Sequence, residues 1–88
     1  MLYRIFTEDT GIKGRKNVAS IVGKQFDGFT LLQGTGYWKG TKEKSMVVEI
    51  VARFIPRKVL NSIVDNIKTV NRQQACLVQT VKNHAYLR

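Results

Sequence analysis

The segment 33–45 holds the residue types best suited to binding an anion. It combines three glycines, two adjacent aromatic residues and three lysines, which are Gly34, Gly36, Tyr37, Trp38, Lys39, Gly40, Lys42 and Lys44. Glycine lets backbone N–H groups approach a phosphate closely, an aromatic ring offers a stacking surface for a base, and lysine supplies positive charge. These eight residues are the predicted ligand-binding site. The alternative interpretation is that the segment is only a structural turn.

The other residues that could act as metal ligands or catalytic groups do not combine into a site. His84 is the only histidine and has no acidic residue or cysteine at ligand spacing, and Cys76 has no histidine close to it in the sequence. We interpret the pair Glu8 and Asp9 as part of a solvated loop. The glycine segment also lacks the phosphate-loop pattern, in which Gly-Lys-Ser/Thr begins a helix. We therefore expect a non-catalytic protein without a metal or cofactor.

The charge of the chain indicates an anionic partner. Fifteen lysines and arginines against six acidic residues give a formal net charge of +9, which attracts phosphate-bearing molecules over long distances. Arg15, Lys16 and Lys24 lie in one predicted helix, and a phosphate backbone could follow them if they converge with the hairpin lysines. A basic nucleic-acid-binding accessory protein is thus the alternative to a small-molecule binding protein. RNA recognition through aromatic side chains on a central strand is disfavoured, because the strand-forming segment 46–53 offers no aromatic side chain. The alternative interpretation is that this charge only maintains solubility.

The length and the cysteine content bound the class of protein. A single domain of 88 residues buries only about 60–65% of its unfolded surface, so oligomerisation would supplement a thin core. One cysteine cannot form an intramolecular disulfide, and Arg4 interrupts the amino terminus before a signal-peptide apolar stretch could develop. No apolar run approaches the roughly 20 residues that span a bilayer. We expect a cytoplasmic protein that does not insert into membranes.

Hydrophobic periodicity predicts six elements that would position the hairpin. Alternating apolar residues predict strands, and an apolar stripe with helical spacing predicts helices. The predicted strands are 2–7, 29–33, 45–53 and 75–81, and the predicted helices are 15–25 and 56–72. The order βαββαβ predicts one ferredoxin-like α+β domain over residues 1–88, with a four-stranded antiparallel sheet and two helices on one face.

The other face of this sheet is predicted to be uncovered. The helix-covered face should be purely apolar, so the alternate set of residues that contains charges is assigned to the open face. That set is Leu2, Arg4, Phe6, Val47, Glu49, Val51 and Arg53. Such a face is too apolar to remain in water, which predicts a subunit interface with the charges paired. The alternative is a half-exposed sheet of ordinary composition.

The hairpin also resembles a known family. Tyr37-Trp38-Lys39-Gly40, followed by a charged turn and the strand-forming segment 43–50, is similar to the second hairpin of CutA-type proteins, which are relatives of the PII signalling proteins. Those families are trimers of ferredoxin-like subunits. The PII branch binds nucleotides or other anionic metabolites in clefts between subunits near this hairpin. The resemblance implies a homotrimer with a ligand at inter-subunit clefts edged by residues 34–44.

Overall fold

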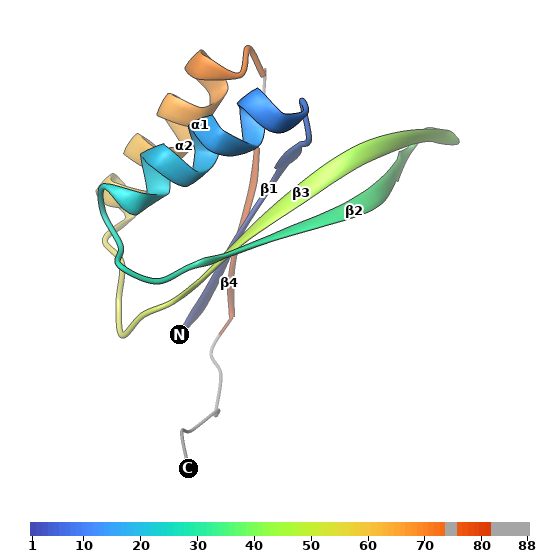
Figure 1. Ribbon diagram of the computed structural model, residues 1–88. Helices are drawn as coiled ribbons and strands as arrows, with labels where there is room; N and C mark the ends of the chain where they lie inside the picture. Colours follow the sequence, from blue (N-terminus) through green and yellow to red (C-terminus); the bar gives the residue numbers. More distant parts are fainter. Residues whose placement is uncertain (74–75, 82–88) are drawn as a thin grey trace.

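The protein is a two-layer α+β domain, seen in a computed structural model that describes residues 1–73 and 76–81. Its elements, in chain order, are β1 (Leu2–Glu8), α1 (Ile12–Gly23), β2 (Thr30–Trp38), β3 (Thr41–Val51), α2 (Arg57–Val70) and β4 (Leu77–Val81). The strands form one antiparallel sheet in the order β2-β3-β1-β4, and both helices lie on the same side of it (Figure 1). The predicted ferredoxin-like fold is confirmed.

The two central strands separate the core from the open face. β1 and β3 pair from Leu2 opposite Val51 to Glu8 opposite Ser45. The residues that they bury beneath the helices alternate along each strand, and these are Tyr3, Ile5, Thr7, Met46, Val48 and Ile50. Successive strand residues point to opposite faces, so the intervening residues, including Arg4 and Glu49, lie on the uncovered side. The predicted assignment of the two faces is therefore correct.

The helices cover the sheet with the apolar residues that the spacing indicated. α2 buries Leu60, Ile63 and Ile67, and α1 buries Val18 and Val22. None of the helices in the described part of the chain is long and apolar enough to cross a membrane.

Both helices begin and end at residues other than the predicted ones. Helix α1 begins at Ile12, so the glycine-containing segment expected to be a loop up to residue 14 supplies its first turn. Gly14 is buried there, and its carbonyl accepts a hydrogen bond from the Asn71 side chain at 3.2 Å. Helix α2 ends at Val70 because Arg72, with φ of 55°, takes the left-handed conformation that terminates helices.

The β2–β3 hairpin is longer and more regular than predicted. The two strands pair continuously from Thr30 opposite Glu49 to Trp38 opposite Thr41, so only Lys39 and Gly40 form the turn. Both turn residues have positive φ, 49° and 78°, as in the two-residue turns that match strand twist. The predicted hairpin with its tip near Lys39 to Lys42 is present, but its strands extend past the predicted ends at residues 33 and 45.

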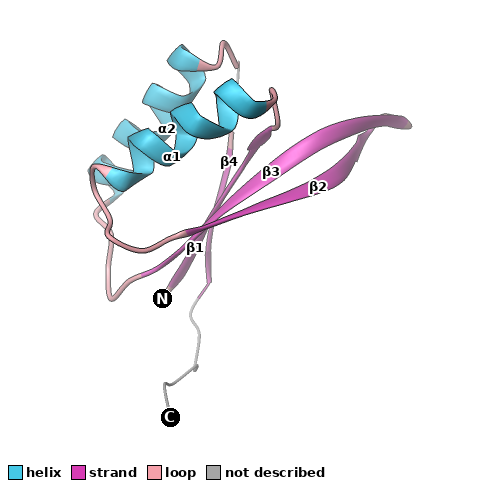
Figure 2. Cartoon of the chain, in the orientation of Figure 1, coloured by secondary structure: helices cyan, strands magenta, loops and turns pink. Residues whose placement is uncertain are grey.

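Residues 35–44 extend past the end of β1, and we call them the hairpin arm. The last residue of β1, Glu8, lies opposite Ser45, so only β2 and β3 continue beyond this point. The arm curves away from the helices and from the rest of the sheet (Figure 2). Its side chains therefore have few neighbours outside the arm.

Two of the arm's glycines are expected to differ in their effect on stability. Gly40→Ala should lower the free energy of unfolding by about 1 kcal/mol, because a Cβ is disfavoured at its φ of 78°. Gly36→Ala should change it by less than about 0.5 kcal/mol, since the new Cβ would lie 3.7 Å from the nearest atom, the Ser45 Cβ. Urea unfolding of the two variants measures the difference, and equal midpoints would contradict the assigned turn.

Candidate functional site

The arm separates the predicted ligand-binding residues onto two faces. Directly opposite strand residues share a face, so Tyr37 lies with Lys42, and Gly36 lies with Glu43 on the other side. Thr35 and Lys44 belong with the first pair, and we call this set the Tyr37 face. The Trp38 side chain is outside the described part of the structure. The eight predicted residues therefore do not form one binding surface.

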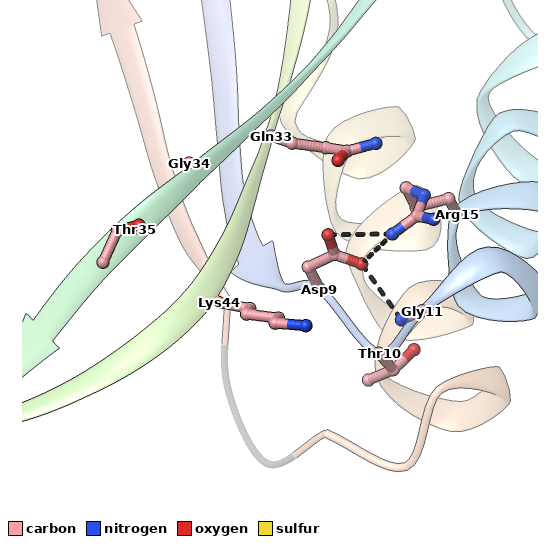
Figure 3. Close-up of a pocket in the computed structure, with 8 residues that line it drawn as sticks. All are labelled: Asp9, Thr10, Gly11, Arg15, Gln33, Gly34, Thr35 and Lys44. Carbon is pink, nitrogen blue, oxygen red and sulfur yellow. Dashed lines mark hydrogen bonds and ion pairs between the residues drawn. The ribbon is translucent and has the colours of Figure 1, made fainter.

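A polar cleft lies at the base of the arm, between the hairpin and the start of α1. This basal cleft has a volume of about 730 Å³, and its lining residues are Asp9, Thr10, Gly11, Arg15, Gln33, Gly34, Thr35 and Lys44 (Figure 3). Only Gly34 and Lys44 were predicted as ligand-binding. Arg15 of α1 and Lys44 of the hairpin both line this cleft. One basic residue of the predicted helix and one of the hairpin lysines therefore lie at the same site.

Asp9 organises one wall of the basal cleft. Its carboxylate accepts hydrogen bonds from Arg15 Nη1 at 2.8 and 3.0 Å and from the Gly11 backbone N–H at 3.0 Å. The side chain is only 6% exposed, so the interpretation of Asp9 as a solvated loop residue is wrong. The Gly11 N–H lowers the pKa of this carboxyl most, and Arg15 and Lys44 lower it further against the opposing effect of burial.

The remaining cleft residues supply positive charge and hydrogen-bond donors. The Asp9 carboxylate balances the charge of Arg15, which leaves the charge of Lys44 in excess. Lys44 projects from β3 toward the β1–α1 connection in Figure 3. The positive end of the α1 dipole already faces the Asp9 carboxylate, which accepts from the N–H of the N-cap residue Gly11, so it adds no free positive charge to the cleft. Lys44 therefore carries the excess positive charge of this cleft.

A second cleft separates the arm from the α2–β4 connection. This lateral cleft has a volume of about 770 Å³ and is lined in part by Phe6, Leu77 and Tyr37. Glu8, Glu43 and Arg72 add charges of both signs, and Lys44 reaches this cleft too. The Gln73 side chain anchors its floor: its Oε1 accepts from the Thr7 hydroxyl and, at 3.2 Å, from the Glu8 backbone N–H.

Six of the seven predicted interface residues lie on the uncovered sheet face. Arg4 Nε donates to Glu49 Oε2 at 2.8 Å, and these charges are surrounded by the half-buried Leu2, Phe6 and Val47 and by the 72% exposed Val51. Exposed Leu32 and Leu77 extend the apolar area onto β2 and β4. Arg53 follows the end of β3 and is exposed in the connection to α2.

Potential metal ligands do not gather in the described residues. Among residues 1–73 and 76–81, no group of three His, Cys, Asp or Glu side chains could hold a metal ion. His84 lies outside these residues. Cys76 is half-buried, with its Sγ 3.6 Å from Thr7 Oγ1 and 3.8 Å from Gln73 Oε1.

Solved structures with the same fold give no functional assignment. A DUF3240 family protein from Shewanella baltica OS155 aligns with a TM-score of 0.66 and 12% sequence identity, covering 99% of this chain and 94% of that chain. The de novo designed protein Foldit4 aligns with a TM-score of 0.53 and 15% identity, covering 93% and 94%. Such low identities show the fold alone. No family model matches the sequence, and no curated protein matches it.

The Asp9 interactions predict a specific pH dependence. Because the pKa of Asp9 is lower in the folded chain than its ordinary 3.8, its stabilising effect is fully present above pH 3.8. The effect is lost as the pH falls through the lowered value. Asp9→Asn should therefore be less stable than wild type at neutral pH, and this deficit should vanish in acid.

Urea unfolding from about pH 7 to about pH 2.5 measures this deficit. Exposed Asp27→Asn is the matched control and should follow the wild-type profile. An Asp9→Asn deficit that stays constant with pH would contradict the assigned ion pair.

Proposed function

We propose that this chain is a non-catalytic binding or regulatory protein that forms a homo-oligomer, with a trimer as the favoured state. It binds a nucleotide-like anionic small molecule in clefts between subunits, at the basal cleft of the hairpin arm. The observation that carries the proposal is the meeting of Lys44 and Arg15 over a polar cleft. A regulator and a sequestering protein would both use such a site.

The size and charge of the basal cleft suit a phosphate-bearing ligand. Small-molecule sites commonly have volumes of about 300–1,000 Å³, and this cleft has about 730 Å³. Lys44 offers an ammonium group that Asp9 does not balance fully, while Thr10, Thr35 and Gln33 offer neutral hydrogen-bonding groups.

The uncovered sheet face supports assembly. Leu2, Phe6 and Val47 surround an ion pair whose two charges already satisfy each other, so a partner can cover the pair without isolating a charge. The resemblance of the hairpin to CutA-type and PII proteins favours three subunits. Chains of net charge +9 repel one another, and anions held between subunits would offset that repulsion.

Assembly through the open face is testable with Val51→Asp. Burying an unpaired carboxylate in an apolar interface costs several kcal/mol, so the variant should dissociate to monomers at micromolar concentration. Ile12→Asp is the control, because Ile12 is similarly exposed, at 68% against 72%, but lies on α1. Sedimentation velocity measures the mass. Wild type that is already monomeric, or a Val51→Asp variant that remains assembled, would contradict the proposal.

Anion binding is testable by calorimetry with ATP as the probe. Lys44→Ala should weaken ATP binding at least about tenfold, because a hydrogen bond to a charged group contributes about 1.5–3 kcal/mol. Lys58→Ala removes the same charge from the first turn of α2 and should change the affinity less than about twofold. Equal losses in the two variants, or no binding of ATP to wild type, would contradict the assigned site.

A further inference from the structure

We infer that the hairpin arm binds single-stranded nucleic acid, with one base stacked on Tyr37 and phosphates contacted by Lys42 and Lys44. This inference goes beyond the proposed small-molecule function and does not require a second subunit. It rests on the Tyr37 face of the arm, which the proposed function uses only at Lys44.

Tyr37 is presented as an open stacking surface. It is 72% exposed, although it is a large aromatic side chain in a regular hairpin, in the second pair from the turn. The arm carries it beyond the end of β1. Among the described elements, no helix or third strand covers the arm there (Figure 1). An exposed aromatic ring stacks on any unpaired base, because every base has a π-face.

The charges on the two sides of the arm are segregated. Lys42 lies directly opposite Tyr37, and Lys44 lies two residues further along on the same face. The only acidic residue of the arm, Glu43, is on the other face. Two lysines beside one exposed ring reproduce the combination that non-specific single-strand binding proteins use, a positive groove with an aromatic platform.

The clefts on either side indicate how a strand would lie. Tyr37 also borders the lateral cleft, but the apolar Phe6 and Leu77 of that cleft lie on the open sheet face, opposite the Tyr37 face. In the lateral cleft Glu8 and Glu43 offset Arg72 and Lys44, whereas the basal cleft has two basic residues against one acidic residue. The phosphate backbone would therefore follow Lys42 and Lys44 toward Arg15 in the basal cleft. A duplex keeps its bases stacked and paired, which denies the ring a partner.

Fluorescence anisotropy with a labelled oligothymidine of about 12 nucleotides tests the inference. Wild type should bind at about 50 mM salt and weaken steeply toward 200 mM. Tyr37→Ala should weaken binding about tenfold or more, whereas Tyr37→Phe should retain it, because stacking needs the ring and not the hydroxyl. Lys42→Ala should weaken binding and reduce the salt slope by about 0.7, the value for one phosphate contact. Lys58→Ala, with the same loss of charge at the other end of the domain, should change affinity less than twofold.

Three results with the oligonucleotides would overturn the inference. They are unchanged binding by Tyr37→Ala in a variant with wild-type circular dichroism, equal weakening by Lys42→Ala and Lys58→Ala, and equal affinity for a duplex of the same length. Polyglutamate that competes as well as the oligonucleotide would also overturn it, because an acidic peptide would then explain the charge. Oligonucleotide binding that survives without any ATP binding would contradict only the proposed small-molecule function.

Discussion

The antiparallel pairing of β1 with β3 positions both surfaces to which function is attributed. Its register places Arg4 opposite Glu49 on the open face and Ile5 opposite Val48 beneath the helices. A slip of one residue would turn the side chains of one strand to the other face and bury its charge, Arg4 of β1 or Glu49 of β3, under α1 and α2. Burial of those charges would lose several kcal/mol of hydration per ion, so the Arg4–Glu49 pair helps to specify the register as well as to occupy the open face.

The same register creates the hairpin arm. β1 reaches no further than Ser45 of β3, so β2 and β3 continue as a two-stranded ribbon without a third strand. The clefts lie where the ribbon leaves the sheet, one toward α1 and the other toward the α2–β4 connection. Lys44 lines both clefts. An anion in the basal cleft and a nucleic-acid strand along the hairpin arm would therefore compete for this residue.

Much of the architecture could be predicted because apolar residues in β3 and α2 recur with the spacing typical of a strand and of a helix. The alternation in residues 46–51 and the stripe of Leu60, Ile63 and Ile67 identify a half-covered strand and its helix. The extension of β2 through Gly34 and Gly36 could not be predicted, since glycine is depleted in strands and indicates turns. The early start of α1 was obscured in the same way by Gly11 and Gly14.

The candidate site was harder to predict than the fold. Segment 34–44 was correctly singled out as a hairpin with lysines near its tip, but a linear sequence does not show that its residues divide between two faces. The Asp9–Arg15 ion pair joins the end of β1 to α1 across a loop. Helical and strand periodicity predict contacts within an element, so neither predicts this pair. Such contacts depend on where the loop folds back, which tertiary packing decides.

The central claim is that the chain assembles and holds an anion between its subunits. Native mass spectrometry of the wild-type protein, sprayed from a volatile buffer at micromolar concentration, tests both parts in one spectrum. The account predicts a complex of three chains carrying additional mass that corresponds to phosphate-bearing ligands, either copurified or added as ATP. A single chain that carries no such ligand, even with ATP present, would contradict it.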